Sequence, residues 1–516
     1  MLVVPETRKL VLATSRHAEI QEVIPDTVVF DHKGQCLTAV EHSVESAQVL
    51  RNMGFKDVPL PITQYYEWPG RFKPRVHQLD TAKFLTANRR ALCLNGPGTG
   101  KTVASLWAAD HLITEGLVKK VLIVAPLSTV KIVWGTELMH HFTHRRFEVL
   151  TQAKARRKAI VEETDAEFLI INHDGFTTMP SWFNDVDLVI YDEATALKNP
   201  STGRYKKFYK FMAENSPWLW MLTGTPISQS PEDAWTLSKL AGSTTVPRSF
   251  NAYRNMVMQK VTNFKWVARP DALETCKSVM QPSIRYSLSE CTDLPETVFI
   301  DRRCELTKQQ TAAYKDMQEQ AMIMGTNISA ANAAVVFQKL LQICCGVVYA
   351  EDGEHVRFDD STRTEAVLQL LSEIGGKCIV FVPLRGVQDR VVEVLSAAGY
   401  DVATVHGGVD KKKRDQVFYD FQNTDKIDVL VAHPRVAAHG LTLTTAKSII
   451  WYAPIHSLEQ YEQANARIRR IGTTGKTAVY NLSASGFESE LYRRLRTKQK
   501  TLSDFLTLVS GINEHS

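Results

Sequence analysis

The stretch Ala91–Leu112, ALCLNGPGTGKTVASLWAADHL, joins two apolar runs through a glycine-rich turn. Its first residues are typical of a β-strand end, and VASLWAADHL is typical of a helix. Between them, Asn95–Thr102 (NGPGTGKT) match the phosphate-binding pattern G-x-x-x-x-G-K-[ST], except that Asn95 replaces the first glycine. A strand, a glycine-rich loop and a helix in this order predict a parallel α/β fold that binds a phosphate group.

The chemistry of this loop follows from its residue types. Glycines let backbone N–H groups turn inward, and the start of the helix adds a partial positive charge. Lys101 is expected to reach the β- and γ-phosphates, and Thr102 to be a ligand of Mg²⁺. The predicted ATP-binding loop comprises Gly96, Pro97, Gly98, Thr99, Gly100, Lys101 and Thr102. The alternative, a glycine-rich turn that only caps a helix, is disfavoured because strand, loop, Lys-Thr and helix follow in order.

A second stretch, Val189–Asn199 (VIYDEATALKN), places two carboxylates where an apolar run ends. Alone, a pair such as Asp192 and Glu193 is more often part of a solvated turn than of a reactive site. With a phosphate loop earlier in the chain, Asp192 is expected to hold the magnesium ion together with Thr102. Glu193 is then predicted to orient and deprotonate the attacking water.

Apolar runs alternate with helix-length segments twice along the 516 residues. The first set is ALCLN, KKVLIVAP, FLIIN, DLVIYDEA and WLWMLTGTP, and the second is GKCIVFVP, ATVHG, IDVLVAH, SIIWYAP and TAVYNL. Such alternation predicts parallel sheets covered on both faces. Pro231 to Ala350, between the two sets, is predicted to be mostly helical, and LPITQYYEWPGRFKPR near residue 70 is interpreted as a linker. Residues from Glu488 to Leu508 are predicted to form a basic amphipathic helix.

Composition limits the class of protein. The apolar share of 44% and the charged share of 23% are normal for a soluble globular chain. The net charge of +5 permits nucleic-acid binding without requiring it. No C-x-x-C pair occurs among the eight cysteines, which disfavours a zinc site. We expect a cytoplasmic protein with no signal peptide and no membrane span.

Several motifs now point to one family. GPGTGKT, DEAT (Asp192–Thr195), LTGTP (Leu222–Pro226) and QANARIRRIG (Gln463–Gly472) resemble motifs I, II, III and VI of superfamily-two helicases. The sequences of these motifs are most similar to those of the Snf-two (Swi/Snf-like) branch, in the short single-chain form of phages and bacteria. The resemblance covers roughly Arg71 to Leu495 and implies two RecA-like lobes. The implied division is a small α+β accessory domain (1–70), lobe one with a helical extension (71–290) and lobe two with a C-terminal helix (291–516).

The resemblance also implies roles for individual residues. Gln78 would read adenine, whereas Gln463, Arg467 and Arg470 would complete the catalytic set, the arginines by stabilising charge on the transferring phosphoryl group. Thr223, Thr225 and Gly440 would couple the nucleotide to lobe movement. Contacts to nucleic acid are implied for Pro126, Ser128, Thr129, Leu441 and Thr442, with Pro126 only shaping its loop. For the RIRRIG segment, a basic helix face that contacts DNA stays an alternative.

The implied function is an ATP- and Mg²⁺-dependent DNA helicase or translocase, acting on single-stranded, duplex or forked DNA. Three alternatives stay open: a duplex translocase that displaces proteins without unwinding, an RNA helicase, and a nucleotide-dependent switch without useful turnover. A monomer is expected, with replication or repair proteins as further partners.

Overall fold

The computed structural model describes residues 1–227, 230–262, 266–291, 297–323, 330–349, 355–437, 443–468 and 475–497. The chain divides into two compact units, Met1–Cys291 and Thr292–Ser516. Each unit contains one large parallel sheet, so the predicted α/β fold class is confirmed. None of the helices in these described ranges is long and apolar enough to cross a membrane.

The first unit is built on a seven-stranded sheet in the order β13-β5-β10-β9-β6-β8-β7. Its strands form because their residues are apolar on both faces; all five residues of VLIVA (β6) and of WLWML (β10) are buried. The strands are β5 (Arg90–Cys93), β6 (Val121–Ala125), β7 (Phe147–Leu150), β8 (Phe168–Asn172), β9 (Leu188–Asp192), β10 (Trp218–Leu222) and β13 (Ser283–Ile284).

Strand order decides which loops become neighbours. Every pairing within this sheet is parallel, so all carboxyl ends lie along one edge. The phosphate loop follows β5, LTGTP follows β10 and the DEAT box follows β9. Because β10 lies between β5 and β9, the three motifs are consecutive along that edge.

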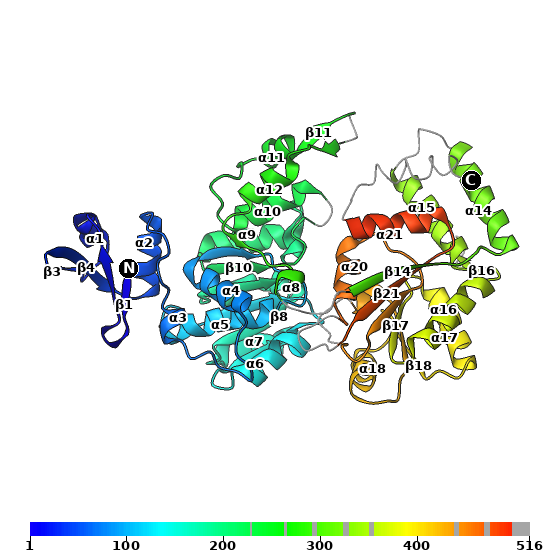
Figure 1. Cartoon of the computed structure of the whole chain (residues 1–516), viewed down its shortest axis with the longest axis horizontal. Coiled ribbons are helices and arrows are strands. Elements are labelled where there is room, and N and C mark those ends of the chain that lie inside the picture. The colour runs from blue at the N-terminus through cyan, green and yellow to red at the C-terminus, as the bar shows by residue number, and fades with distance from the viewer. Residues whose placement is uncertain are drawn as a thin grey trace. The chain divides into compact units, whose positions relative to one another are not determined.

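Helices cover this sheet and extend it. They are α4 (Val76–Ala87), α5 (Lys101–Thr114), α6 (Thr136–His141), α7 (Lys154–Glu163), α8 (His173–Thr178), α9 (Gly203–Asn215), α10 (Ala234–Leu240), α11 (Phe250–Val257), α12 (Ala272–Val279) and α13 (Leu288–Cys291). Figure 1 shows α10, α12 and α11 stacked as a helical extension, with the short hairpin of β11 (Met258–Lys260) and β12 (Trp266–Ala268) at its end.

The first residues fold as a small α+β module, as predicted. Its antiparallel sheet has the order β1-β2-β4-β3, and two helices accompany it. The elements are β1 (Leu2–Val4), β2 (Lys9–Ala13), α1 (His17–Val23), β3 (Val28–His32), β4 (Gln35–Glu41) and α2 (Val44–Asn52). Its buried residues join the core that includes α4 and α5. The three-part domain division therefore stays a prediction.

The segment interpreted as a linker is packed within the first unit, so that interpretation was wrong. It contains the helix α3 (Ile62–Tyr65). The Tyr66 hydroxyl donates a 2.5 Å hydrogen bond to the buried Asp110 carboxylate, and Trp107 Nε1 donates to Pro69 O at 2.8 Å. The Trp68 ring lies edge-on to Trp107 at 5.7 Å. Proline and aromatic content is typical of a linker, but here the rings fill a surface of α5.

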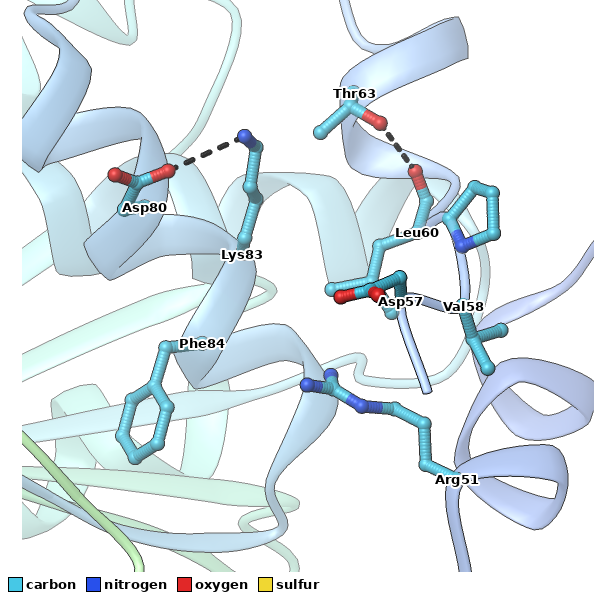
Figure 2. Close-up of a pocket in the computed structure, with 9 residues that line it drawn as sticks. Arg51, Asp57, Val58, Leu60, Thr63, Asp80, Lys83 and Phe84 are labelled. Carbon is cyan, nitrogen blue, oxygen red and sulfur yellow. Dashed lines mark hydrogen bonds and ion pairs between the residues drawn. The ribbon is translucent and has the colours of Figure 1, made fainter. Parts of the chain in front are cut away.

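A pocket of about 300 Å³ lies where the module meets α4. Figure 2 shows the Arg51 guanidinium extending into it, the Lys83 ammonium turned to Asp80, and the Thr63 hydroxyl on the Leu60 carbonyl. The Lys83–Asp80 pair spans 3.3 Å and is partly exposed. With Asp57 also on its wall, this pocket holds two cationic and two anionic side chains and has no net preference for either charge.

The second unit carries a six-stranded sheet in the order β14-β21-β20-β17-β19-β18, with every pairing parallel. Its strands are β14 (Thr297–Arg303), β17 (Cys378–Phe381), β18 (Val402–Val405), β19 (Val429–Ala432), β20 (Ser448–Trp451) and β21 (Thr477–Ser483). A hairpin joins β15 (Val347–Tyr349) to β16 (His355–Arg357). The helices are α14 (Lys308–Ile323), α15 (Ala330–Cys344), α16 (Ser361–Ile374), α17 (Arg385–Ala397), α18 (Lys411–Asn423), α19 (Pro434–Ala437), α20 (Leu458–Asn465) and α21 (Gly486–Thr497).

Two predictions about secondary structure need adjustment. The stretch from Pro231 to Ala350 is helical in large part, but it also supplies β13 and β14, which complete the two large sheets. Strand β13 has only two residues, and the seven residues of β14 are all exposed or half-buried, so pairing with β5 and β21 stabilises both. The predicted C-terminal helix is present as α21 up to Thr497; its continuation to Leu508 lies outside the described residues.

Candidate ATP site

The phosphate loop begins where β5 ends and leads directly into α5. Gly98 and Gly100 have φ angles of +81° and +83°, a left-handed conformation that glycine adopts without strain. Lys101 and Thr102 are the first two residues of α5. The loop amides and the helix start are therefore arranged for an anion, as the sequence predicted.

Asn95, which replaces the first glycine of the pattern, has a structural role. Its side chain is buried, donates from Nδ2 to Thr81 Oγ1 at 2.8 Å, and accepts from the Tyr286 amide at Oδ1, also at 2.8 Å. The Gly96 amide in turn donates to Tyr286 O at 2.8 Å. Asn95 thus ties the loop to α4 and to the segment after β13, which no motif indicated.

The Lys101 ammonium lies within the loop that it is predicted to serve. Nζ donates to Asn95 O at 2.8 Å and to Gly96 O at 3.1 Å. The Thr99 hydroxyl also donates to Gly96 O, at 2.8 Å. These contacts hold the cation on the loop, where a bound phosphate would replace the carbonyl oxygens as its partner.

Gln78, the predicted adenine reader, lies against this loop from the start of α4. Its Oε1 accepts from the Arg75 amide at 2.9 Å, and its Nε2 donates to Thr99 O at 3.4 Å. The neighbouring His77 Nε2 lies 2.8 Å from the same Thr99 oxygen. Gln78 is only 3% exposed, so its polar atoms would have to exchange partners to read a base. Its role as adenine reader stays a prediction.

Gly100→Ala is expected to lower ATP affinity about tenfold, because strain and a steric clash of order 1–3 kcal/mol act on the loop itself. An added Cβ would lie 2.2 Å from Gln78 Nε2 and would displace that side chain. ATP binding to the purified protein, measured by calorimetry, checks this. Gly399→Ala is the matched control, because Gly399 has a similar φ of +88° with no atom within 4 Å of the new Cβ. Equal ATP affinity in the two variants would contradict the expectation.

The DEAT box follows β9 at the same sheet edge. Asp192 Oδ2 accepts a 2.9 Å hydrogen bond from Trp134 Nε1, and Oδ1 accepts from the Glu193 amide at 3.0 Å. Burial raises the pKa of Asp192 above its ordinary value, while the Trp134 hydrogen bond and the Lys101 charge oppose that rise. A cation bound beside this carboxylate would favour its charged form and so oppose the rise further.

Glu193 has the unusual backbone conformation φ +49°, ψ +56°. A non-glycine residue in the left-handed region costs of order 1 kcal/mol and is typical of functional turns. The turn is supported by His173, whose Nε2 lies 2.9 Å from Asp192 O and whose ring stacks on Tyr191 at 4.9 Å. His173 is therefore a positioning residue for the DEAT turn.

Trp134 is a site residue that sequence reasoning missed. It lies on a π-helix, Val130–Gly135, and is fully buried. A π-helix turns side chains out of the usual α-helical register and frequently marks a functional site. The available signal was an indole in an apolar run (KIVW), since a buried indole N–H requires an acceptor.

LTGTP lies between the other two motifs along the sheet edge. The Thr223 amide donates to Cys93 O at 3.0 Å, and the Thr225 amide donates to Thr223 Oγ1 at 3.2 Å. A Cβ added at Gly224 would lie 3.0 Å from Pro97 Cδ. This segment therefore touches the phosphate loop directly, which is the contact that its predicted coupling role requires.

The predicted nucleic-acid segment of the first unit follows β6. The Thr129 hydroxyl and amide both donate to Pro126 O at 2.9 Å, and Thr129 is 6% exposed. Ser128 is half-buried. Thr129 thus closes a turn, and its hydroxyl is already used within that turn.

In the second unit, α20 carries Gln463, and Arg467 follows shortly after its end. Arg467 Nε donates to Gln463 O at 3.0 Å, and its own carbonyl accepts from the Leu443 amide at 3.1 Å. Both side chains are 6% exposed. The remaining predicted residues, Gly440, Leu441, Thr442 and Arg470, lie outside the described residues.

These features define an ATPase with a helicase-type arrangement of motifs on one sheet edge. The SNF2-related domain family matches residues 77–346, more than half of the chain, and the helicase conserved C-terminal domain matches residues 362–472. The chain belongs to the SNF2-related family. It is an ATP-dependent enzyme of the helicase and translocase class.

Curated relatives extend over most of the chain. Putative protein p41 of Acyrthosiphon pisum secondary endosymbiont phage 1 is 24% identical over 465 residues, which covers 84% of this chain and 98% of p41. An uncharacterized ATP-dependent helicase, YqhH of Bacillus subtilis, is 25% identical over 496 residues, which covers 86% of this chain and 83% of YqhH. A chromodomain-helicase-DNA-binding protein 3 homolog of Caenorhabditis elegans is 22% identical over 474 residues, covering 82% of this chain and 26% of the homolog.

Proposed function

We propose that this chain is a motor that couples ATP hydrolysis to stepwise movement along DNA. The observation that carries the proposal is the succession of phosphate loop, LTGTP and DEAT box at three adjacent strand ends of one sheet. A chain that only binds nucleotide has no need of Glu193 as a base for an attacking water. DNA is favoured as the track because the family resemblance implies it and because a relative over most of this chain is a DNA-binding helicase by name.

In this mechanism the loop amides from Gly96 to Gly100 and the Lys101 ammonium bind the phosphates. Glu193 accepts a proton from the attacking water, and Arg467 and Arg470 stabilise negative charge on the phosphoryl group as it transfers. Gln78 reads the adenine after exchanging its present hydrogen bonds. Thr223 and Thr225, with Gly440 in the second unit, couple ATP binding and hydrolysis to movement of the residues that contact DNA.

Magnesium fits the donors that the first unit offers. Thr102 and Asp192 would hold it. Among the described residues, Asp192 Oδ2 accepts one hydrogen bond from Trp134 and Oδ1 accepts one from the Glu193 amide, which leaves lone pairs on both oxygens for a cation. Burial raises the pKa of this carboxylate, and a divalent ion beside it would lower that pKa by favouring the charged form. When bound, Mg²⁺ would neutralise charge on the phosphate oxygens.

Trp134→Phe is expected to raise the Mg²⁺ concentration for half-maximal ATPase rate about tenfold, as removal of a group that orients a metal ligand typically does. The variant keeps an aromatic ring but removes the N–H donor to Asp192. A magnesium titration of the ATPase rate checks it. Trp220→Phe is the control, since Trp220 is equally buried and donates to Asn88 O at 3.0 Å, away from the DEAT box. Identical magnesium curves for both variants would reject the positioning role.

DNA contacts are proposed to be independent of sequence. Ser128 and Thr129, with Leu441 and Thr442, contact the phosphate backbone, and such contacts position a protein without reading bases. The turn that Thr129 closes supports a contribution by backbone amides more than by its own hydroxyl.

Arg470→Ala is expected to bind ATP nearly normally yet hydrolyse it at least about tenfold more slowly, because a guanidinium at the phosphoryl group acts mainly in the transition state. Arg467→Ala is expected to behave in the same way, with the pair sharing the charge. Stopped-flow ATP binding beside steady-state turnover separates the two effects. Arg493→Ala removes an exposed arginine paired with Glu490 and serves as the charge control. Unchanged turnover in Arg470→Ala would contradict the role of Arg470 in stabilising the transferring phosphoryl group.

The function is tested by ATP turnover without nucleic acid and with single-stranded DNA, duplex DNA, forked DNA or RNA. Stimulation by DNA, together with loss of turnover in Lys101→Ala, supports a DNA motor. Strand release then distinguishes a helicase from a duplex translocase that only displaces proteins. Stimulation by RNA alone would contradict the proposal that the motor moves along DNA. We further propose a cytoplasmic monomer, with replication or repair proteins as its partners.

A further inference from the structure

A second pocket in the first unit, of about 440 Å³, lies at the opposite edge of the sheet from the ATP loop. Arg90, the first residue of β5, is on its wall, whereas the phosphate loop follows the last residue of that strand. Lys239 and Arg248 add two more cations, and Tyr209 of α9 adds an aromatic ring. Buried Met212 and Leu240 contribute apolar surface.

The three cations have no ion pair with any carboxylate in the part of the chain that the structure describes. Lys239 Nζ lies over the Trp235 ring at 5.7 Å. Glu214, on the same helix as Tyr209, pairs instead with Lys210 at 3.6 Å. Cations that line a concave surface together without an acid are unusual, because like charges repel and partly buried charges are normally paired.

Arg90 is the cation of this pocket whose charge is most affected by its surroundings. The guanidinium is half-buried, and its pKa is lowered first by burial and then by the like charge of Arg89. Two other arginines of the described residues that are at least partly buried have carboxylate partners: Arg145 contacts Asp110 and Glu167, and Arg363 contacts Glu488. Arg90 is therefore a desolvated cation whose missing counter-charge a ligand can supply.

The chemistry of the wall indicates the class of ligand. A guanidinium and an ammonium together suit a phosphate group, which accepts several charge-assisted hydrogen bonds. The Tyr209 side chain is 45% exposed and offers a ring face or edge to a planar group. A volume of about 440 Å³ lies within the range of small-molecule sites.

We propose that this pocket binds the phosphate of a nucleotide, with Arg90, Lys239 and Arg248 on the phosphate and Tyr209 against the sugar or base. Free nucleotide and a terminal phosphate of nucleic acid share this chemistry. The site is separate from the ATP loop and does not depend on the motor function proposed above.

The test uses the full chain with its ATP loop saturated by a non-hydrolysable ATP analogue. Inorganic phosphate and dTMP are titrated by calorimetry, followed by an oligonucleotide with and without a 5′-phosphate. The variants are Arg90→Gln with Lys239→Gln, and separately Arg248→Gln, whose exposed side chain makes misfolding no concern. The control is Lys206→Gln with Lys277→Gln, which removes two exposed lysines outside the pocket.

We expect dTMP to bind the wild type and the control alike, and about tenfold or more weakly to the double variant, because each lost charge-assisted bond contributes more than an ordinary hydrogen bond. Arg248→Gln is expected to weaken binding less. A dependence on the oligonucleotide 5′-phosphate that disappears in the double variant, without dTMP binding, would identify nucleic acid as the source. Binding of neither probe, or equal binding by all variants, would overturn the site.

Discussion

Glu193→Gln is expected to lower the rate constant of ATP hydrolysis by about 10²–10⁴-fold, the usual contribution of a positioned general base. The amide keeps the size and the hydrogen-bonding shape of the carboxylate but cannot accept the proton of the attacking water. ATP affinity is expected to stay nearly unchanged, because the loop amides and Lys101 bind the phosphates. Single-turnover hydrolysis beside equilibrium ATP binding measures the two quantities separately.

The backbone at Glu193 makes this variant informative. Glutamine at φ +49° has the same strain as glutamate, so the turn after β9 should be preserved. Glu163→Gln, an exposed acid on α7, controls for the loss of one negative charge. Hydrolysis by Glu193→Gln at the wild-type rate would reject Glu193 as the base while leaving ATP binding at the loop intact.

Glu488→Ala is expected to lower the free energy of unfolding of the second unit by about 3–5 kcal/mol, the range for breaking one side of a buried ion pair. Arg363 Nη2 donates to the two Glu488 oxygens at 2.8 and 2.6 Å, and the two side chains are 1% and 0% exposed. Arg363 also donates from Nη1 to Tyr452 O, and Glu488 accepts from the Ala484 amide at 2.8 Å. Removal of the carboxylate leaves a guanidinium buried without its counter-charge.

Two controls separate this cause from a simple loss of contacts. Arg302→Ala breaks the Arg302–Glu373 pair, which is 41% exposed on each side, and is expected to cost at most about 1 kcal/mol. The double variant Arg363→Met with Glu488→Leu removes both charges and is expected to recover most of the lost stability, as apolar replacement of buried ion pairs often does. Denaturant unfolding measures all three. A double variant less stable than Glu488→Ala would contradict the expected cause.

How far the sequence could be interpreted depends on the range of the interactions involved. Strands such as β6 and β10 are continuous apolar runs, and the phosphate loop is fixed by local glycine conformations, so both were predictable. The sequence also identified DEAT and LTGTP as motifs. The strands β13 and β14 were not predictable, because pairing with the edge of a sheet formed elsewhere in the chain stabilises them.

Local chemistry explains what the sequence determined by itself: a glycine-rich turn before a helix, two acids at a strand end and the α/β alternation of a superfamily-two chain. Only the tertiary structure decided that β10 lies between β5 and β9, that Trp134 holds Asp192, that Asn95 anchors the loop, and that Tyr66 packs on Asp110. Those contacts join residues far apart in the chain. Strand order and burial bring such residues together, and neither is encoded in any single stretch.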